Sequence, residues 1–343
     1  MIPKHLSLVC HADWSKSEKK RWRAHASRQG DGSFQAYPPE PVESSANLIG
    51  DLRETAGSEA SVLLGFDFPI GFPEAYARKA KINNFLTILP ELGKGDWSEF
   101  FDVSETQEQV NIRRPFYPKK PGKAAQQHLL DGLQVDSIND LRRKCELSQP
   151  GRRAAAPLFW TLGAQQVGKA AISGWREVLQ PALHNQGVLI WPFAGHLLDL
   201  LQPGKTVIVE TYPAEFYRLI GNAQHIQKKN PAFIRTNLSG NNRSGSKCSQ
   251  ERRKADAAGI LKLIHQLGIS ILPELLRTIQ DGFGEAAAGE DAFDAVVGLI
   301  GMLYSLENWA GSEEFEGFEP GSPAIGNFEG WIFGQPFEKR FQN

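Results

Sequence analysis

Several short stretches of this chain have the hydrophobic pattern of β-strands. Residues 62–66 and 205–210 are nearly continuous apolar runs, which is typical of strands buried on both faces of a sheet. Near the N-terminus, residues 5–9 predict a first strand, residues 22–26 alternate between apolar and polar positions, and residues 34–37 predict a third strand. A Gly-Asp-Gly turn joins the last two, so we expect the first three strands to form a meander.

Helical periodicity dominates the rest of the chain. Apolar side chains three and four positions apart predict amphipathic helices at residues 48–52, 163–183, 255–267 and 291–304. Residues 80–155 have weak periodicity and mixed polarity, and we interpret them as an insertion of helical pieces and long loops. The order of elements predicts an α/β fold in a single domain, residues 1–343, with a mixed sheet and helices on its faces.

The composition is that of a globular protein with a sizeable core. The chain has 343 residues, of which 41% are hydrophobic and 22% are charged, and this excludes wholesale disorder. Its longest apolar run, residues 295–304, is too short for a membrane span, which needs about 18 residues. The N-terminus lacks the apolar core of a signal peptide, and the three cysteines are widely spaced without a CxxC pair. We therefore expect a cytoplasmic protein that does not associate with membranes.

Charge is balanced in total but unevenly distributed. The formal net charge is −1, which argues against a protein that coats nucleic acid through bulk electrostatics. Basic residues nonetheless gather in residues 16–28, 113–123 and 235–254, whereas residues 278–338 contain twelve acids and no Lys or Arg. Solvated loops and a solvated acidic tail explain this pattern as well as an anionic substrate on basic loops does.

Carboxylates stand where predicted elements end or begin. Asp13 follows the first strand, Asp67 ends the central buried strand, and Glu210 ends the later buried strand. Asp291 and Asp294 open the last helix, and residues three apart on a helix share a face. Taken singly, each is better explained as a turn residue or a helix cap than as a functional acid. Together they suggest a site at the carboxyl ends of the strands, where α/β sheets place their ligands.

Such a group of carboxylates favours divalent cations. Two like charges about 4 Å apart repel by roughly 4 kcal/mol at an effective dielectric constant of 20, so protons or cations must neutralise them. Hard oxygen ligands select Mg²⁺ or Mn²⁺ over zinc. Two such ions can activate a water molecule and stabilise the leaving oxygen in phosphodiester hydrolysis, which is the reaction that this site composition predicts.

The motifs around these acids resemble a known family. The segments GFDFPIGFP, VIVETYPAEFY, DAFDAVVGLIGML and EGWIFGQ follow the first acid in order, and the pattern is similar to domain-of-unknown-function family 429, described as predicted nucleases of ribonuclease H-like fold. The resemblance implies a five-stranded mixed sheet with helices on both faces. It implies catalytic roles for Asp13, Asp67, Glu210, Asp291 and Asp294, with all but Asp291 as metal ligands. The paired acids of the last helix also resemble those of Holliday-junction resolvases.

Cationic and other polar candidates flank these motifs. Lys247, Arg252 and Arg253 follow a loop rich in Gly and Ser, and Arg114 lies in a basic stretch with two aromatic residues. These four could bind a nucleic acid substrate by neutralising phosphate charge, or could simply be solvated. His11, two residues before Asp13, is better explained as a packed strand histidine than as a general base.

Two classes of function remain open from the sequence. The first is a nuclease that depends on Mg²⁺ or Mn²⁺ and hydrolyses phosphodiester bonds in nucleic acid. The second is a non-catalytic ribonuclease H-like module that binds a nucleotide, a nucleic acid or a protein. A phosphotransferase of the sugar-kinase type is disfavoured, because no glycine-rich phosphate loop follows Asp13.

Overall fold

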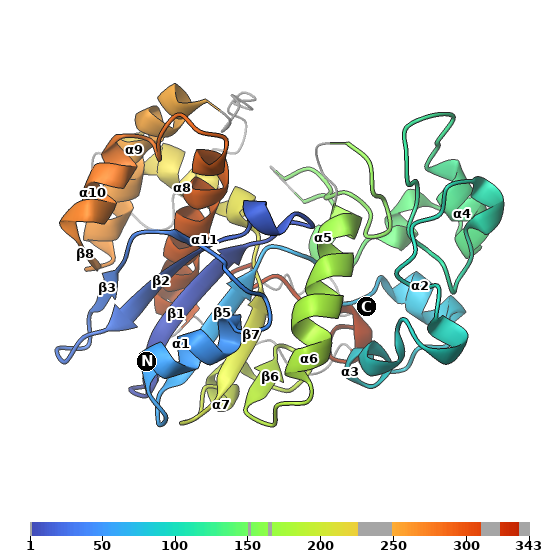
Figure 1. Cartoon of the computed structure of the whole chain (residues 1–343), viewed down its shortest axis with the longest axis horizontal. Helices are drawn as coiled ribbons and strands as arrows, with labels where there is room; N and C mark the ends of the chain where they lie inside the picture. Colours follow the sequence, from blue (N-terminus) through green and yellow to red (C-terminus); the bar gives the residue numbers. More distant parts are fainter. Residues whose placement is uncertain (1, 150–151, 164–166, 226–248, 310–322, 336–343) are drawn as a thin grey trace.

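The computed structural model describes residues 2–149, 152–163, 167–225, 249–309 and 323–335 (Figure 1). Its strands are β1 (Leu6–Asp13), β2 (Trp22–Arg28), β3 (Phe34–Ala36), β4 (Glu40–Pro41), β5 (Ser61–Phe66), β6 (Val188–Ile190), β7 (Thr206–Glu210) and β8 (Ser270–Ile271). Its helices are α1 (Leu48–Ala56), α2 (Glu74–Lys79), α3 (Phe85–Ile88), α4 (Gln127–Leu133), α5 (Val167–Gly174), α6 (Gln180–Ala182), α7 (Leu197–Leu200), α8 (Pro213–His225), α9 (Gln250–Gln266), α10 (Pro273–Gln280) and α11 (Ala288–Trp309). Shorter helical segments are η1 (Glu18–Lys20), η2 (Leu89–Glu91), η3 (Gly95–Trp97), η4 (Gln107–Gln109), η5 (Ile138–Leu141), η6 (Lys144–Glu146), η7 (Trp175–Leu179) and η9 (Ile325–Glu329).

In the described part of the chain, the strands form one mixed sheet of eight strands rather than the five that the resemblance implies, in the order β6-β7-β5-β1-β2-β3-β8, with β4 beside β2. β2 is antiparallel to both β1 and β3, so the predicted meander is confirmed. β1, β5, β7 and β6 are parallel to one another, which brings their carboxyl ends to one edge of the sheet. β1 runs to Asp13, four residues beyond its predicted end, because Asp13 still pairs with Trp22 of β2.

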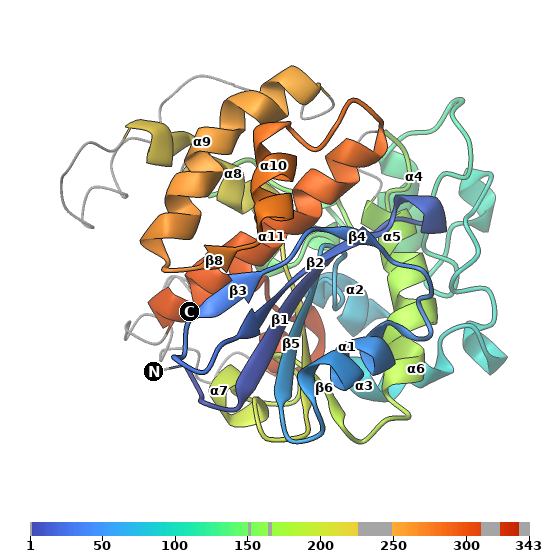
Figure 2. The same cartoon turned by 60° about the vertical axis from the view of Figure 1, so that its left-hand side comes forward.

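Helices cover both faces of the sheet, so the expected α/β layering is confirmed at this level. α8, α9, α10 and α11 lie together on one face, and α1, α5 and α6 lie on the other (Figures 1 and 2). Side chains alternate accordingly, since successive residues of a strand point to opposite faces. In β5, Leu63 joins the core beneath α11, whereas Leu64 and Phe66 join the core of the opposite face.

The longest helix, α11, packs unusually close to β1. A side chain at Gly298 would overlap the ring of His11, and one at Gly301 would overlap Phe216 of α8. Glycine therefore allows the helix backbone to approach the strand, despite its poor helix propensity. This close approach brings the first turns of α11 towards the carboxyl end of β1.

The insertion at residues 80–155 consists of short helices and loops, as expected. It is nevertheless well packed, because its aromatic side chains join the core of the sheet face opposite α11. Phe85, Phe100 and Phe116 are fully buried there, and Phe85 and Phe100 lie against Trp175. The insertion is thus a continuation of the main core rather than a loosely attached loop.

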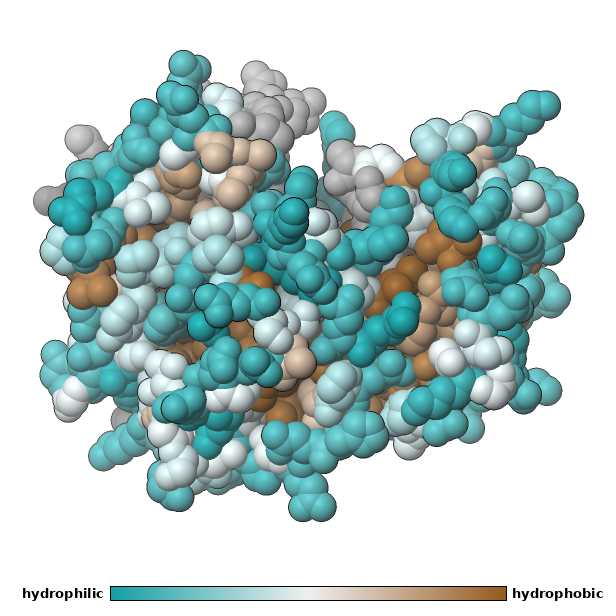
Figure 3. Space-filling model, viewed as in Figure 1, coloured by the Kyte–Doolittle hydropathy of each residue, from teal (hydrophilic) through white to brown (hydrophobic). Residues whose placement is uncertain are grey.

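None of the helices described is both long enough and apolar enough to cross a membrane. The face of the molecule seen in Figure 3 is mostly hydrophilic, with smaller groups of apolar side chains among the polar ones.

Candidate functional site

Two aspartates lie side by side at the carboxyl edge of the sheet. Asp13 is the last residue of β1, and Asp67 directly follows β5, whose Phe66 is the register partner of Ala12. The backbone N–H of Trp14 donates a hydrogen bond to Oδ1 of Asp67 at 2.7 Å. This bond fixes the Asp67 carboxylate next to the end of β1. Asp13 is 8% exposed and Asp67 is partly buried.

A third aspartate comes from the helix above this edge. Asp294 lies in the second turn of α11 and is buried, and its Oδ1 accepts a hydrogen bond from the hydroxyl of Tyr217 on α8. Burial, together with the negative charges of Asp294, Asp13 and Asp67, raises the pKa of Tyr217 well above its usual range. Asp294 thus contacts the tyrosine hydroxyl directly, and Asp13 and Asp67 are near enough for their charges to raise its pKa. We call Asp13, Asp67 and Asp294 the acid cluster.

Asp291 and His11 belong to the surroundings of this cluster. Asp291 lies in the first turn of α11, one turn before Asp294, and is partly exposed. His11 is fully buried under Gly298, and burial lowers its pKa to about 3, an effect that the backbone of Ala295 opposes only weakly. The histidine is therefore neutral at physiological pH and packs beneath α11, as the sequence led us to prefer.

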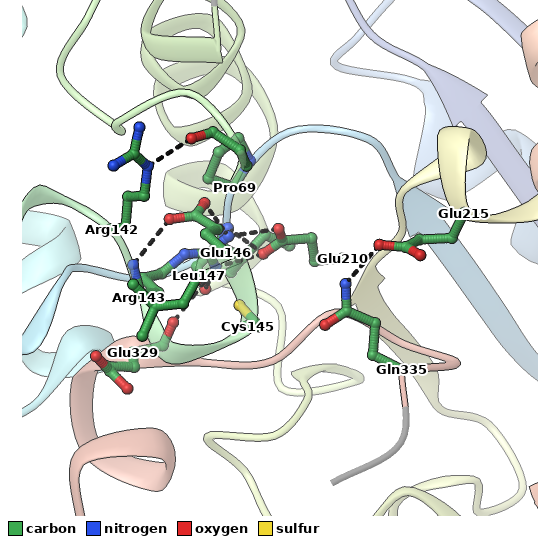
Figure 4. Close-up of polar contacts among 12 residues, drawn as sticks. Pro69, Arg142, Arg143, Cys145, Glu146, Leu147, Glu210, Glu215, Glu329 and Gln335 are labelled. Carbon is green, nitrogen blue, oxygen red and sulfur yellow. Dashed lines mark hydrogen bonds and ion pairs between the residues drawn. The ribbon is translucent and has the colours of Figure 1, made fainter. Parts of the chain in front are cut away.

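Glu210 lies on the other side of the sheet, which does not agree with its assignment as a metal ligand. Its register partner is Phe66, whose side chain points away from α11, so Glu210 also faces the insertion. There, Nη1 and Nη2 of Arg143 donate to its two carboxylate oxygens at 2.6 and 2.5 Å, and the backbone N–H of Ile70 donates at 2.7 Å (Figure 4). Both oxygens are thus occupied by donors of the protein itself.

Arg143 is the centre of a buried polar network. Its Nη2 also pairs with Glu146 at 2.7 Å, and its Nη1 donates to the carbonyl oxygens of Ile70 and Glu329 at 3.1 and 3.3 Å. Burial raises the pKa of the Glu210 carboxyl, an effect that Arg143 opposes. Since Arg143 belongs to the insertion and Glu210 to β7, we interpret this network as the attachment of the insertion to the sheet.

Burial also shifts the titration of Glu329, close to this network. Glu329 is 2% exposed, and burial raises the pKa of its carboxyl from 4.5 to about 7, while Lys144 and the backbone N–H of Glu74 partly oppose the shift and the Glu74 charge adds to it. The folded protein therefore holds a proton that the unfolded chain releases between about pH 4.5 and pH 7. Over this window the contribution of Glu329 to stability is lost as the pH rises.

We expect Glu329→Gln to remove this pH dependence. Each pH unit of the window is worth about 1.4 kcal/mol, so the wild-type chain should lose at most about 3 kcal/mol more than the variant across it. Urea unfolding of both proteins below pH 4.5 and above pH 7 measures the difference, and the shared contribution of His11 cancels. Parallel pH profiles of the two proteins would contradict the assignment.

The predicted substrate-binding cations have mostly structural contacts. Arg253 is 1% exposed and donates to the carbonyl oxygens of Gly282 and Gly284 at 2.9 and 2.7 Å. Arg252 lies 3.6 Å from Asp256, and Arg114 lies 3.3 Å from Glu99. Lys247 lies outside the described residues.

Tyr217 and Arg143 are the residues that the sequence analysis missed. Tyr217 stands seven residues after Glu210 in the segment VETYPAEFY, so its helical position carries it away from Glu210 and towards α11. Arg143 lies in the weakly periodic insertion, where no pattern indicates which arginine is buried. A tyrosine just past the first turn of a helix that follows a strand is the only sequence signal that either of them gives.

Metal coordination is not preformed in the acid cluster. Over the residues that the structure describes, no group of three or more His, Cys, Asp or Glu side chains is arranged to hold a metal ion. Carboxylate oxygens are nevertheless the donor type that suits Mg²⁺ and Mn²⁺. Comparisons with protein-family models, with curated proteins and with solved structures found no match to this chain.

Proposed function

We propose that the acid cluster is the active centre of a metal-dependent phosphodiesterase that hydrolyses nucleic acid. One observation carries this proposal: Asp13 and Asp67 lie at the adjacent ends of β1 and β5, joined through the N–H of Trp14, and Asp294 of α11 bonds Tyr217, whose pKa all three acids raise. The cluster lies at the carboxyl ends of parallel strands, where α/β proteins place their ligands. The mixed sheet that begins with a meander supports a ribonuclease H-like fold as part of the same proposal.

The donor set fits a magnesium-type ion held together with water. Mg²⁺ usually keeps several water ligands and binds through one or two carboxylates, so a closed cage of three side chains is not required. Asp13, Asp67 and Asp294 are the residues that would hold the ion. When bound, such an ion polarises a phosphoryl oxygen and lowers the pKa of a water ligand. Glu210 is not available as a ligand for a second ion, because Arg143 donates to both of its carboxylate oxygens.

The protein's own groups orient this site. The N–H of Trp14 holds one oxygen of Asp67, and the hydroxyl of Tyr217 holds one oxygen of Asp294. Because each bond fixes one oxygen of a carboxylate, it also fixes the direction in which the other oxygen of that carboxylate points. Asp13 ends a strand, Asp67 directly follows one and Asp294 lies in a long helix, which keeps such a site in a defined geometry.

A cleavage assay tests the proposal. Labelled single-stranded and duplex DNA and RNA are incubated with the protein in Mn²⁺, in Mg²⁺ and in EDTA. We expect cleavage of at least one substrate in the presence of metal and none in EDTA. A panel that stays intact under every condition would favour the second candidate, a non-catalytic binding module.

A further inference from the structure

One basic segment of the sequence adjoins the acid cluster directly. The connection between β1 and β2 begins after Asp13 and ends at Trp22, which is the register partner of Asp13. Residues 15–20 of this connection, which we call the lysine loop, contain Lys16, Lys19 and Lys20, all exposed at the surface, and one acid, Glu18. The turn η1 within it lies at the carboxyl edge of the sheet (Figure 1), where the surface is strongly hydrophilic (Figure 3).

A buried arginine holds the lysine loop in place. Arg21 is 1% exposed, and its guanidinium donates to the carbonyl oxygens of Ser15 and Lys16 at 2.7 and 3.4 Å. The same group pairs with Glu177 at 2.6 Å and lies 4.2 Å from the centre of the Trp14 ring. Trp14 is itself packed against Phe66 and Phe68. Arg21 thus ties the backbone of Ser15 and Lys16, the first two residues of the loop, to the core.

Several other exposed cations of the chain lie beside acids, whereas the lysines of this loop are set apart by their place next to Asp13. Lys119 pairs with Glu105 at 2.5 Å and Lys254 with Asp281 at 3.4 Å, and the predicted Arg114 and Arg252 also lie beside acids. Lys16, Lys19 and Lys20 form no ion pair with any residue that the structure describes. Their charge is therefore available to an external anion.

The spacing fits a chain of phosphates that passes the acid cluster. Lys16 is three residues from Asp13, which corresponds to at most about 10 Å of extended chain. Phosphates follow one another by about 3.4 Å of helix rise along one strand of a duplex. A strand with one phosphodiester at the acid cluster would consequently have phosphates within reach of the loop.

We propose that Lys16, Lys19 and Lys20 form the rim that binds the phosphate backbone of nucleic acid beside the acid cluster. This inference rests on the proposed function, since it assigns the substrate-binding surface of that same site. It replaces the earlier candidates Arg252, Arg253 and Arg114, whose charges are paired or buried. Because lysine acts as a point charge, the rim would bind the backbone without reading the base sequence.

Binding measured without catalysis tests the inference separately from the proposed activity. A fluorescein-labelled single-stranded oligonucleotide is titrated with the protein in EDTA over a range of salt concentrations, and anisotropy gives the Kd. The triple variant Lys16→Ser/Lys19→Ser/Lys20→Ser is compared with Lys4→Ser/Lys79→Ser/Lys94→Ser. The control removes the same charge from exposed lysines away from the loop, and Lys4 lies at the opposite end of β1.

We expect the loop variant to bind at least about tenfold more weakly at low salt, and the slope of log Kd against log salt to fall by about 2, since each single-strand phosphate contact contributes about 0.7. The control should bind as the wild type does. Equal losses in both variants would reduce the effect to bulk charge, and a wild-type chain that binds no oligonucleotide in EDTA would refute the inference. Binding that depends on the three lysines, without cleavage in Mn²⁺, would overturn the proposed activity and support the lysine rim as a nucleic-acid-binding surface.

Discussion

Replacing Asp294 with asparagine is expected to lower the rate of metal-dependent phosphodiester cleavage by roughly 10³-fold. The charge stabilisation that a metal ion supplies is worth several kcal/mol, and each 1.4 kcal/mol of barrier is a factor of ten in rate. Asparagine keeps an oxygen that can accept the hydrogen bond of Tyr217, so the fold around α11 should survive while the ligand charge is lost. Asp67→Asn should behave in the same way, because Asp67 belongs to the same acid cluster and asparagine keeps an oxygen that can accept from the N–H of Trp14.

The matched control is Asp136→Asn, which removes one carboxylate charge from an exposed position of the insertion. Its cleavage rate should equal that of the wild-type chain. Thermal unfolding of all three variants shows whether each is folded at the assay temperature. Full activity in folded Asp294→Asn or Asp67→Asn would remove the acid cluster from the reaction.

Replacing Glu210 with glutamine is expected to destabilise the protein by about 3–5 kcal/mol. The variant leaves the buried guanidinium of Arg143 with one carboxylate partner, Glu146, in place of two. Breaking a buried ion pair by removing one partner costs about this much, because the other charge stays buried and poorly compensated. The free energy of unfolding is measured by urea titration of both proteins, and the m-value of the variant should equal that of the wild type.

A double-mutant cycle with Arg143→Gln tests whether the two residues act as a pair. The loss in the double variant should be smaller than the sum of the single losses, since both charges of the pair are then removed together. Glu215→Gln is the control: it removes a less buried carboxylate, which pairs with Arg152 at 3.0 Å, and should cost less. If Glu210→Gln retained full stability but lost cleavage activity, Glu210 would belong to the reacting centre.

The different fates of Asp67 and Glu210 show what the sequence could and could not predict. Both end nearly continuous apolar strands that lie side by side in the sheet, and both were expected at its carboxyl edge. The face of the sheet to which each acid points depends on the strand register. Glu210 pairs with Phe66, one residue before Asp67, so Glu210 and Asp67 point to opposite faces. Strand register is set by contacts between distant segments, so hydrophobic runs buried on both faces give no sign of it.

The helices and the meander were easier to predict, because their signals are local. The apolar periodicity of residues 291–304 predicted α11 to within a few residues of its start and five of its end. Lys16, Lys19 and Lys20 stood within a basic stretch, but only the pairing of Asp13 with Trp22 brings them to the acid cluster. Arg253, by contrast, was predicted from the sequence to bind substrate and is a buried residue of α9.

The most direct test of the central claim is anomalous diffraction from crystals soaked in Mn²⁺. The account predicts a manganese peak bordered by the carboxylates of Asp13, Asp67 and Asp294, and no peak at Glu210, whose oxygens Arg143 occupies. Two results would contradict the assignment of the acid cluster as a metal site. One is a manganese peak at Glu210, and the other is clear electron density for the three carboxylates with no manganese peak near the hydroxyl of Tyr217.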